Sequence, residues 1–341
     1  MKKLLNTLYV LTPESYLYCR NENICVKIGG VEKQSIPAIS IDGVVCFGQM
    51  TVSTPLIEFC GKQGITITFL SQNGRFFGRV CGPVSGNVLL RKKQYESINH
   101  QELSAQIVRN ILFGKLRNGK AVLLRAARTE QREAVSGKLF DTAQKLSELA
   151  QQLSRCGEID SMRGIEGAAA SLYFARFDDM LSEKCAFRFG ERSRRPPRNE
   201  VNAVLSFLYT ILTRDVQAAL ETVGLDPAAG YLHTLRPGRP SLALDMLEEL
   251  RAPLCDRSVL SLFNRGQLTQ KDFEADSQAV MLNERGRKTV LTSWQKRKQE
   301  EITHPFLDEK IQIGMIPYAQ AMLFARMLRG DLDCSPPFSW R

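Results

Sequence analysis

The sequence predicts an α+β protein, with a small, mainly β domain over residues 1–85 followed by a large all-α domain over residues 86–341. Three observations support this division. Short runs rich in β-branched residues, separated by turn residues, fill the first eighty or so positions. From about residue 87 the apolar residues recur every three or four positions, which is typical of helices that bury one face. The length of 341 residues also suits about two domains.

The N-terminal part contains six runs that favour strands, at residues 4–11, 16–20, 24–28, 41–47, 64–70 and 75–81. The residues after the second run, Asn21-Glu22-Asn23, favour a hairpin loop because asparagine tolerates a left-handed backbone. Gln72-Asn73-Gly74 is expected to turn the fifth run into the sixth. One short helix is expected to open at Ser53-Thr54-Pro55, with proline in its first turn, and to end at Gly61 or Gly64.

Helical spacing dominates the rest of the chain. It predicts helices at residues 103–112, 139–153, 162–182, 199–222, 241–251 and 317–329. The last of these has proline in its first turn and Gly330 just past its end. Residues 280–282 and 289–291, on either side of Glu284-Arg285-Gly286, are expected to form a hairpin inside the helical part.

The composition favours a folded protein with an anionic partner. Hydrophobic residues make up 43% of the chain, which excludes disorder as its overall state. Lysine and arginine number 46 against 36 acidic residues, so the net charge is +10 and nucleic acid is a plausible partner, although many basic enzymes bind none. Since no signal peptide and no apolar run of the ~18–20 residues that cross a bilayer are evident, we expect a soluble, cytoplasmic protein without a membrane partner.

Cysteine gives no sign of a metal site. The nine cysteines are an odd number, and the sequence lacks the C-x-x-C pairs of a zinc site. A chain of this size does not need disulfides to fold, so we expect reduced, mostly buried thiols.

Two basic clusters stand out. Residues 188–198 carry five arginines around Pro196-Pro197, which forbids a helix there. Residues 285–298 carry further arginines and lysines on either side of Trp294. Each cluster alone is equally compatible with a solvated loop or helix face, but two of them in one basic chain favour phosphate contacts, because clustered cations release counterions on binding.

One apparent motif is discarded. Residues 114–121 match the spacing of a phosphate-binding loop, but Ala121 stands where a hydroxyl should hold magnesium. The preceding run is also helical rather than a strand, so nucleotide binding is not expected. Gly119, beside Asn118, is expected to end a helix.

Histidine is scarce, and one of the three has acidic neighbours. His100 and His304 resemble surface or cap residues, whereas His233 follows a loop punctuated by proline and glycine. The next predicted helix carries Asp245 and Glu248, and a spacing of three places both on one face. Carboxylates beside a buried stripe are costly unless they are paired or bind a metal. An ordinary amphipathic helix with acidic flanks remains the alternative.

Glu166 lies among unusually small residues in the sequence Arg163-Gly164-Ile165-Glu166-Gly167-Ala168. The two glycines each cost a helix about 1 kcal/mol relative to alanine. Small residues allow another helix or a phosphate to approach the backbone closely. Tight helix packing is the simpler explanation of the two.

Three blocks together resemble a known family. Residues 163–167, residues 224–233 from Gly-Leu-Asp-Pro to His233, and residues 241–248 occur in the order of the signature of the CRISPR-associated integrase family, the endonuclease that inserts new spacers into CRISPR arrays. The resemblance spans the chain, including the N-terminal β domain. The length and the Arg-Pro-Pro-Arg insertion resemble a type I system, and the I-C branch in particular.

The resemblance implies a catalytic site. Glu166, His233 and Glu248 would hold a divalent metal, and Asp245 would be an additional acidic residue of the catalytic set. Two carboxylates and one imidazole suit Mg²⁺ or Mn²⁺, with the nitrogen favouring Mn²⁺. Three arginines near these positions could contact DNA phosphates or instead form salt bridges with Glu166 or Asp245; they are Arg163, Arg236 and Arg239.

The same resemblance implies a reaction and partners. A 3′-hydroxyl of a short duplex, the spacer precursor, would attack a phosphodiester at the leader–repeat boundary of the CRISPR array. The protein would be a homodimer joined largely through its β domains. Two such dimers would flank a dimer of a small ferredoxin-like second adaptation protein in a heterohexamer.

Two other functions remain open at this point. A non-catalytic DNA-binding scaffold would keep the fold and lose the metal. An RNA-processing nuclease would need recognition features for RNA, and the sequence shows no sign of the stacking aromatic residues of an RNA-recognition sheet.

Overall fold

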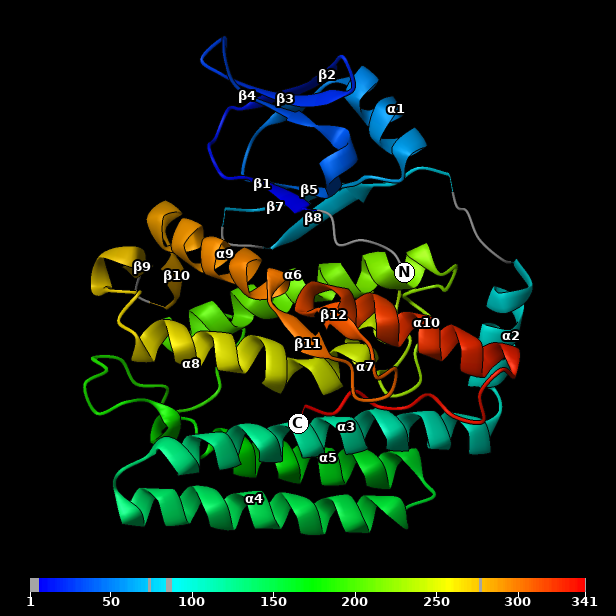
Figure 1. Ribbon diagram of the computed structural model, residues 1–341, viewed down its shortest axis with the longest axis vertical. Coiled ribbons are helices and arrows are strands. Elements are labelled where there is room, and N and C mark those ends of the chain that lie inside the picture. Colours follow the sequence, from blue (N-terminus) through cyan, green and yellow to red (C-terminus); the bar gives the residue numbers. More distant parts are fainter. Residues whose placement is uncertain (1–5, 73–74, 84–87, 276–277, 341) are drawn as a thin grey trace.

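The computed structural model describes residues 6–72, 75–83, 88–275 and 278–340. A β part spans residues 6–80 and a mainly helical part spans residues 88–329, so the predicted α+β class is confirmed (Figure 1). The expected domain boundary after residue 85 and most of the expected turn at residues 72–74 lie outside the described residues. No helix in the described part of the chain combines the length and apolar character that crossing a bilayer demands.

In its described residues the β part has two four-stranded sheets, one α-helix and a short 3₁₀ helix at Ala38–Ser40. Sheet one has the order β1-β5-β7-β8, with the first three strands parallel, and sheet two has the order β4-β3-β2-β6. The bounds of these elements are β1 Asn6–Val10, β2 Tyr16–Arg20, β3 Asn23–Ile28, β4 Val31–Pro37, β5 Ile41–Phe47, β6 Thr51–Val52, α1 Thr54–Gln63, β7 Thr66–Leu70 and β8 Phe76–Val80. The hairpin at Asn21 and Glu22 is confirmed by the positive φ of both residues, and α1 ends at Gly64 in the left-handed conformation, as expected.

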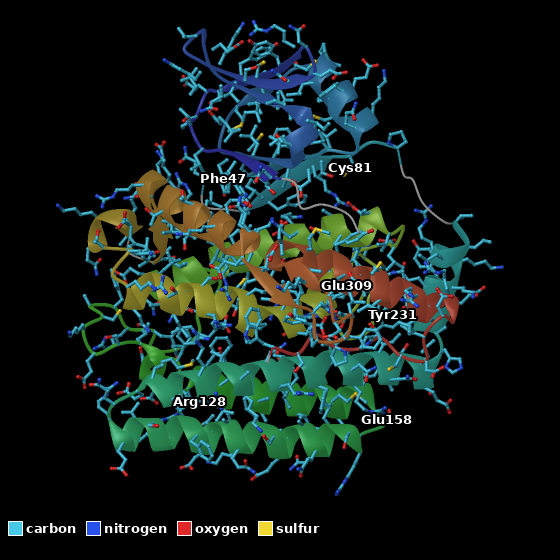
Figure 2. The ribbon with its side chains drawn as sticks, in the orientation of Figure 1. Phe47, Cys81, Arg128, Glu158, Tyr231 and Glu309 are labelled. Atoms are coloured by element: carbon cyan, nitrogen blue, oxygen red, sulfur yellow. The ribbon has the colours of Figure 1, made fainter. Side chains whose placement is uncertain are left out.

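Sheet one joins the β part to the helical part. Alternate residues of a strand point to opposite faces, and β5 uses both faces. Val44 and Cys46 pack in the small core between the two sheets, whereas Val45 and Phe47 pack in the large core of the helical part. The Phe47 ring lies 5.8 Å from that of Phe207, at the base of the β part (Figure 2).

The helical part has nine α-helices in its described residues, and α3, α4 and α5 lie together at the end farthest from the β part (Figure 1). The helices are α2 Val88–Ile98, α3 Gln101–Thr129, α4 Glu133–Ser154, α5 Ile159–Phe174, α6 Glu200–Thr222, α7 Ser241–Leu250, α8 Arg257–Asn264, α9 Glu284–Gln299 and α10 Ile316–Arg329. A π-helical segment, Arg251–Asp256, joins α7 to α8 without a break. Two short hairpins complete this part: β9 Phe273–Ala275 with β10 Val280–Leu282, and β11 Glu301–Thr303 with β12 Lys310–Gln312.

Several local expectations were wrong. β10 pairs with β9 and not with residues 289–291, because Asn283 caps the start of α9 and that segment is helical. The helix expected over 162–182 ends at Phe174. Gly119 does not end a helix; it lies inside α3, where the side chains of Leu146 and Tyr173 pack against it.

Three further expectations concern two of the histidines, the cysteines and residues 188–198. His100 caps α3 through its Nδ1, as expected, whereas His304 is buried, and its Nδ1 accepts backbone hydrogen bonds from Phe306 and Leu307. The cysteines are all free thiols and five of the nine are buried, as expected. Residues 188–198 contain no helix, in agreement with the Pro-Pro pair.

Candidate metal centre

The loop between α6 and α7 is organised around the buried carboxylate of Asp245. Its Oδ2 accepts hydrogen bonds from the backbone N–H groups of Tyr231 (2.6 Å) and Leu232 (3.0 Å). Its Oδ1 accepts from the backbone N–H of His233 (2.9 Å) and contacts Nδ1 of the same histidine at 2.6 Å. Because a carboxylate only accepts, Nδ1 donates a proton to Asp245, which leaves Nε2 as the ring nitrogen that could bind a metal.

Asp245 therefore positions His233 and has no oxygen left for a ligand. A carboxylate that fixes the tautomer of an imidazole is the usual support for a metal-binding histidine. Close approach of the loop to α7 depends on Gly230, since a Cβ there would lie 2.6 Å from the carbonyl carbon of Ser241 and 2.7 Å from Oδ2 of Asp245.

Glu248 lies one turn after Asp245 on α7, and its side chain is only 4% exposed. Its Oε1 contacts Nη1 of Arg251 at 2.7 Å and lies 3.9 Å from Nε2 of His233. Its Oε2 lies 2.7 Å from Nζ of Lys115, but the angles are not those of a hydrogen bond. Burial alone would raise the pKa of Glu248, but Arg251 and Lys115 outweigh it and bring the pKa down to about 2.

Glu166, on α5, contacts the same lysine as Glu248. Its Oε1 forms an ion pair with Lys115, so one ammonium group of α3 bridges Glu166 and Glu248. Within the described ranges no three histidine, cysteine or acidic side chains are close enough to form a ready metal-binding group. Two of the three predicted ligands, Glu166 and Glu248, thus share one cation, Lys115, and the third, His233, lies beside Glu248 with its Nε2 3.9 Å from Oε1.

The segment that carries Arg251 is braced by a second buried carboxylate. Asp256, at the end of the π-helical segment, accepts hydrogen bonds from Tyr173 of α5 (3.0 Å) and Tyr209 of α6 (2.6 Å). Burial raises the pKa of Asp256 to about 6. These bonds tie α5, which carries Glu166, to the segment that follows Glu248.

The small residues beside Glu166 are not explained by helix packing. A Cβ added at Gly164 or Gly167 would meet nothing within 4 Å, and both glycines and Ala168 are exposed. The alternative of tight packing is therefore wrong for these positions. The backbone of α5 next to Glu166 is instead open to an approaching ligand.

The three arginines expected near the site have different surroundings. Arg163 donates from Nε (3.1 Å) and Nη2 (2.7 Å) to the carbonyl oxygen of Leu232 and also pairs with Asp160. It thereby holds the loop just before His233. Arg236 is exposed and Arg239 is half-buried. In the described chain, none of the three forms the salt bridge with Glu166 or Asp245 that was the alternative to a DNA contact.

Sequence reasoning missed Lys115 and Arg251. Lys115 lies inside the discarded phosphate-loop match, between the buried residues Gly114 and Leu116, and a lysine on such a face was a usable signal. Arg251 follows Glu248 by three residues, the spacing of an ion pair on a helix. Neither spacing indicates that the two cations meet at one glutamate.

Comparisons with known proteins identify the family. Residues 8–296 match the family described as CRISPR associated protein Cas1. The chain is 47% identical to "CRISPR-associated endonuclease Cas1 1" of Chlorobaculum tepidum and 48% identical to "CRISPR-associated endonuclease Cas1 2" of Rhodospirillum rubrum, each over the full length of both chains.

Solved structures share the fold. A Cas1 protein from Thermotoga maritima has a TM-score of 0.82 at 24% identity and covers 96% of this chain and 97% of its own. A casposase bound to integration product has a TM-score of 0.82 at 20% identity, covering 96% and 92%. A chain of a Cas6-RT-Cas1–Cas2 complex has a TM-score of 0.83 at 23% identity, covering 100% and 36%. The resemblance inferred from three sequence blocks is confirmed: this chain belongs to the CRISPR-associated Cas1 family.

Proposed function

We propose that the protein is a divalent-metal-dependent DNA endonuclease and integrase that inserts short duplex DNA into a CRISPR array in the cytoplasm. The observation that carries this proposal is that Lys115 pairs with both Glu166 and Glu248, while Nε2 of His233 lies 3.9 Å from Oε1 of Glu248. The names of the full-length relatives support the endonuclease activity.

The residues at this position fit a divalent metal. The donors are two carboxylates and an imidazole whose Nδ1 is held by Asp245 and whose Nε2 lies on the side of Glu248, a set that suits Mg²⁺ or Mn²⁺. The buried Oε2 of Glu248 has no hydrogen-bond donor, and the carboxylates already stabilise the charge of Lys115. When bound, the metal would stabilise the negative charge that develops on the phosphate in the transition state.

Each residue of the site has a distinct role in the proposed reaction. Glu166, His233 and Glu248 would hold the metal, and Asp245 keeps the imidazole in the binding tautomer. Arg251 keeps Glu248 ionised. In the reaction, the 3′-hydroxyl oxygen of the incoming strand forms a new bond to phosphorus, and the bond to the departing 3′-oxygen of the target strand breaks.

DNA would reach the site across the open face of α5. Gly164 and Gly167 leave the backbone beside Glu166 uncovered, and the net charge of +10 favours an anionic strand. Arg236 and Arg239 follow His233 on the exposed loop and are proposed to contact its phosphates. Arg163 is proposed to act mainly by holding that loop, since its guanidinium already binds the carbonyl of Leu232.

The direct test is a strand-joining and cleavage assay with a branched DNA and Mn²⁺. Activity should be lost in Glu166→Ala and His233→Ala and retained in Glu158→Ala, a control at the start of α5. Joining that survives both site substitutions would reject the metal site. DNA binding without joining or cleavage in the wild-type protein would instead favour a scaffold, a function compatible with carboxylates that are neutralised by Lys115.

We propose that residues 1–85 form a dimerisation domain within the two-domain organisation. Its surface exposes large apolar side chains, including Val31 (57% exposed) and Ile39 (87%). Two dimers would then flank a dimer of a small ferredoxin-like partner, and the Cas6-RT-Cas1–Cas2 complex, one chain of which shares this fold, supports a partner of the Cas2 kind.

Light scattering tests the dimer. Val31→Lys and Ile39→Lys should shift the protein towards the monomer, whereas Phe140→Lys, at an exposed phenylalanine of α4 in the helical part, should not. A dimer that tolerates both substitutions in the β domain would place the interface elsewhere.

A further inference from the structure

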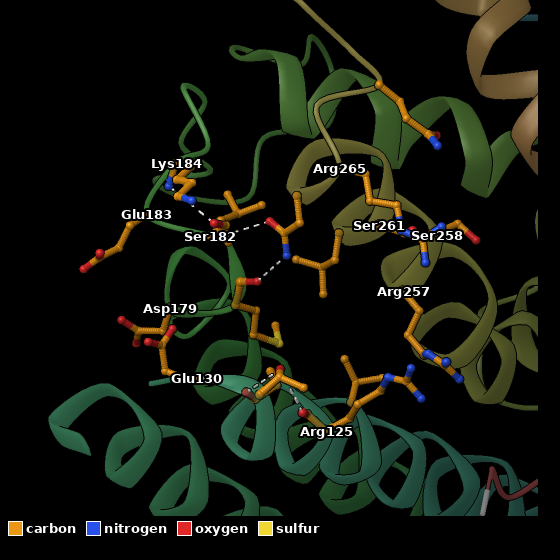
Figure 3. Close-up of a pocket in the computed structure, with 18 of the residues that line it drawn as sticks. Arg125, Glu130, Asp179, Ser182, Glu183, Lys184, Arg257, Ser258, Ser261 and Arg265 are labelled. Atoms are coloured by element: carbon orange, nitrogen blue, oxygen red, sulfur yellow. Dashed lines mark hydrogen bonds between the residues drawn. The ribbon is translucent and has the colours of Figure 1, made fainter. Parts of the chain in front are cut away.

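A second polar cavity lies away from the metal centre. It has a volume of about 920 Å³ and is bounded by the C-terminal end of α3, residues 179–184, α8 and α9 (Figure 3). None of the residues proposed to hold the metal lines it. Arg125, which lines the cavity, lies ten residues after Lys115 on α3 and is therefore about 15 Å farther along the same helix.

Three arginines gather at one side of this cavity. Arg125 of α3 and Arg257 of α8 extend towards the same side from two walls (Figure 3), and Arg297 of α9 joins them. Burial, together with Arg297 and Arg125, lowers the pKa of Arg257 to about 10. A guanidinium whose charged form is penalised by its neighbours is stabilised by an anion.

The carboxylates that line the cavity are already engaged. Arg132 pairs with Glu130 and Glu183, Arg176 pairs with Asp179, and Arg297 pairs with Glu300. No ion pair of Arg125 or Arg257 is found within the described ranges. Arg297 is thus paired with Glu300, whereas Arg125 and Arg257 carry positive charge that no ion pair in the described residues compensates.

Two of these arginines also have buried donors without acceptors. Nη1 of Arg257 and Nη2 of Arg297 are both buried and make no hydrogen bond. An unpaired buried donor is unfavourable, so an oxygen acceptor that reached these groups after a small side-chain movement would stabilise them. Phosphate oxygens match guanidinium donors best, because the planar group binds two of them at once.

Trp340 holds the arginines in place. The guanidinium of Arg257 lies 4.6 Å from the centre of its ring and that of Arg297 lies 5.3 Å away. The tryptophan itself is fixed, because its backbone N–H donates to Oδ1 of Asn118 at 2.8 Å. Donors that are ordered before binding lose little entropy when the ligand arrives.

We propose that this cavity is a second phosphate-binding site, which holds the backbone of a DNA strand that extends from the metal centre. The proposal rests on the proposed DNA function and deepens it. At about 3.4 Å per nucleotide of duplex, the separation of about 15 Å corresponds to four or five nucleotides. The strand would be held by its phosphates alone, with no reading of its bases.

Salt-dependent DNA binding tests the site without any catalysis. Labelled duplex and single-stranded DNA are titrated in EDTA with the wild type, Arg125→Gln, Arg257→Gln and the control Arg128→Gln. Arg128 is an exposed arginine of α3 outside the cavity (Figure 2). Each cavity substitution should weaken binding about tenfold, as expected for one lost charge-assisted bond, and should reduce the salt slope by about 0.9 for duplex DNA or 0.7 for single strands. The control removes a charge one helical turn from Arg125 but outside the cavity lining, so it should change affinity and salt slope much less than the cavity substitutions do.

A second titration separates a DNA strand from a free phosphate compound. Calorimetry with pyrophosphate reports whether the cavity binds phosphate groups at all. If the cavity variants lose pyrophosphate binding but keep wild-type DNA affinity and slope, the site serves a free phosphate ester and the assignment to DNA is overturned. If they lose neither, the site itself is rejected.

Since Arg125 is exposed, its variant should fold normally even if Arg257→Gln disturbs Trp340. A failure of strand joining with intact binding would reject the proposed reaction and leave this site standing.

Discussion

Replacement of Lys115 by methionine tests how the metal centre is stabilised before metal arrives. The ammonium contacts Glu166 and lies 2.7 Å from Oε2 of Glu248, whose side chain is 4% exposed. Removing one partner of a buried ion pair typically costs 3–5 kcal/mol. Because Lys115 is 18% exposed and Glu166 is 29% exposed, we expect the lower end of that range, about 3 kcal/mol.

This loss translates into a measurable shift in melting temperature. At about 2.1 cal/mol/K per residue, the unfolding entropy of 341 residues is about 0.7 kcal/mol/K. The metal-free variant should therefore melt about 4 °C below the wild type. With Mn²⁺ part of this difference in melting temperature should disappear, because in the variant the metal does not have to displace an ammonium. Calorimetry should give a lower Kd for Mn²⁺ in the variant than in the wild type.

Lys120→Met is the matched control, since Lys120 lies on the same helix and contributes no ion pair in the described chain. It should leave both the melting temperature without metal and the affinity for Mn²⁺ close to those of the wild type. If Lys115→Met melts like the wild type, or if its Mn²⁺ affinity falls, the interpretation of the ammonium as the occupant of the metal position is refuted.

Three further predictions concern residues around the site. Asp245→Asn should lower the affinity for Mn²⁺ 10- to 100-fold in calorimetry. The reason is that an amide cannot accept from all four donors that now fix the His233 loop. Unchanged affinity would show that Asp245 does not position His233. Gly230→Ala should lower the free energy of unfolding in urea by about 1–3 kcal/mol, because the added Cβ would overlap α7. Gly167→Ala, in open space on α5, should instead raise it by up to about 1 kcal/mol. Equal effects of the two substitutions would contradict the structure. Burial raises the pKa of Glu249 to about 8, so its protonated form contributes stability that is fully present below about pH 4.5 and is lost as pH rises towards 8. Urea unfolding should show the free energy of unfolding falling between pH 7 and 8 by up to about 1.4 kcal/mol per pH unit. In Glu249→Gln the free energy of unfolding should start lower and depend less on pH. If the variant keeps the wild-type slope, another group causes the decline.

Most of the fold could be predicted because local patterns determine it. The period of two at residues 64–70 marks the face of β7 that packs in the small core, and the helical spacing in α4 and α10 marks the buried face of each helix. β4 was missed because its side chains are mostly exposed and leave no apolar alternation. Gly119 was misassigned because the sequence shows a glycine but not the neighbouring Leu146 and Tyr173 side chains, which pack against α3 at that point and bury it inside the helix.

The candidate site could be predicted only in part, for a similar reason. The order of Glu166, His233 and Glu248 is visible in the sequence through the family signature. The role of Asp245 depends on a loop that bends back so that three successive N–H groups meet one carboxylate. Lys115 comes from a helix 51 residues before Glu166 in the chain, and only the tertiary fold brings the two together. No local spacing encodes such a contact.

Anomalous diffraction from crystals soaked in Mn²⁺ would test the central claim most directly. The account predicts one peak bounded by Glu166, His233 and Glu248, with ligand distances of about 2.0–2.6 Å and the Lys115 ammonium displaced from between the carboxylates. A peak at other residues, or a Lys115 that still bridges Glu166 and Glu248 at saturating Mn²⁺, would contradict it.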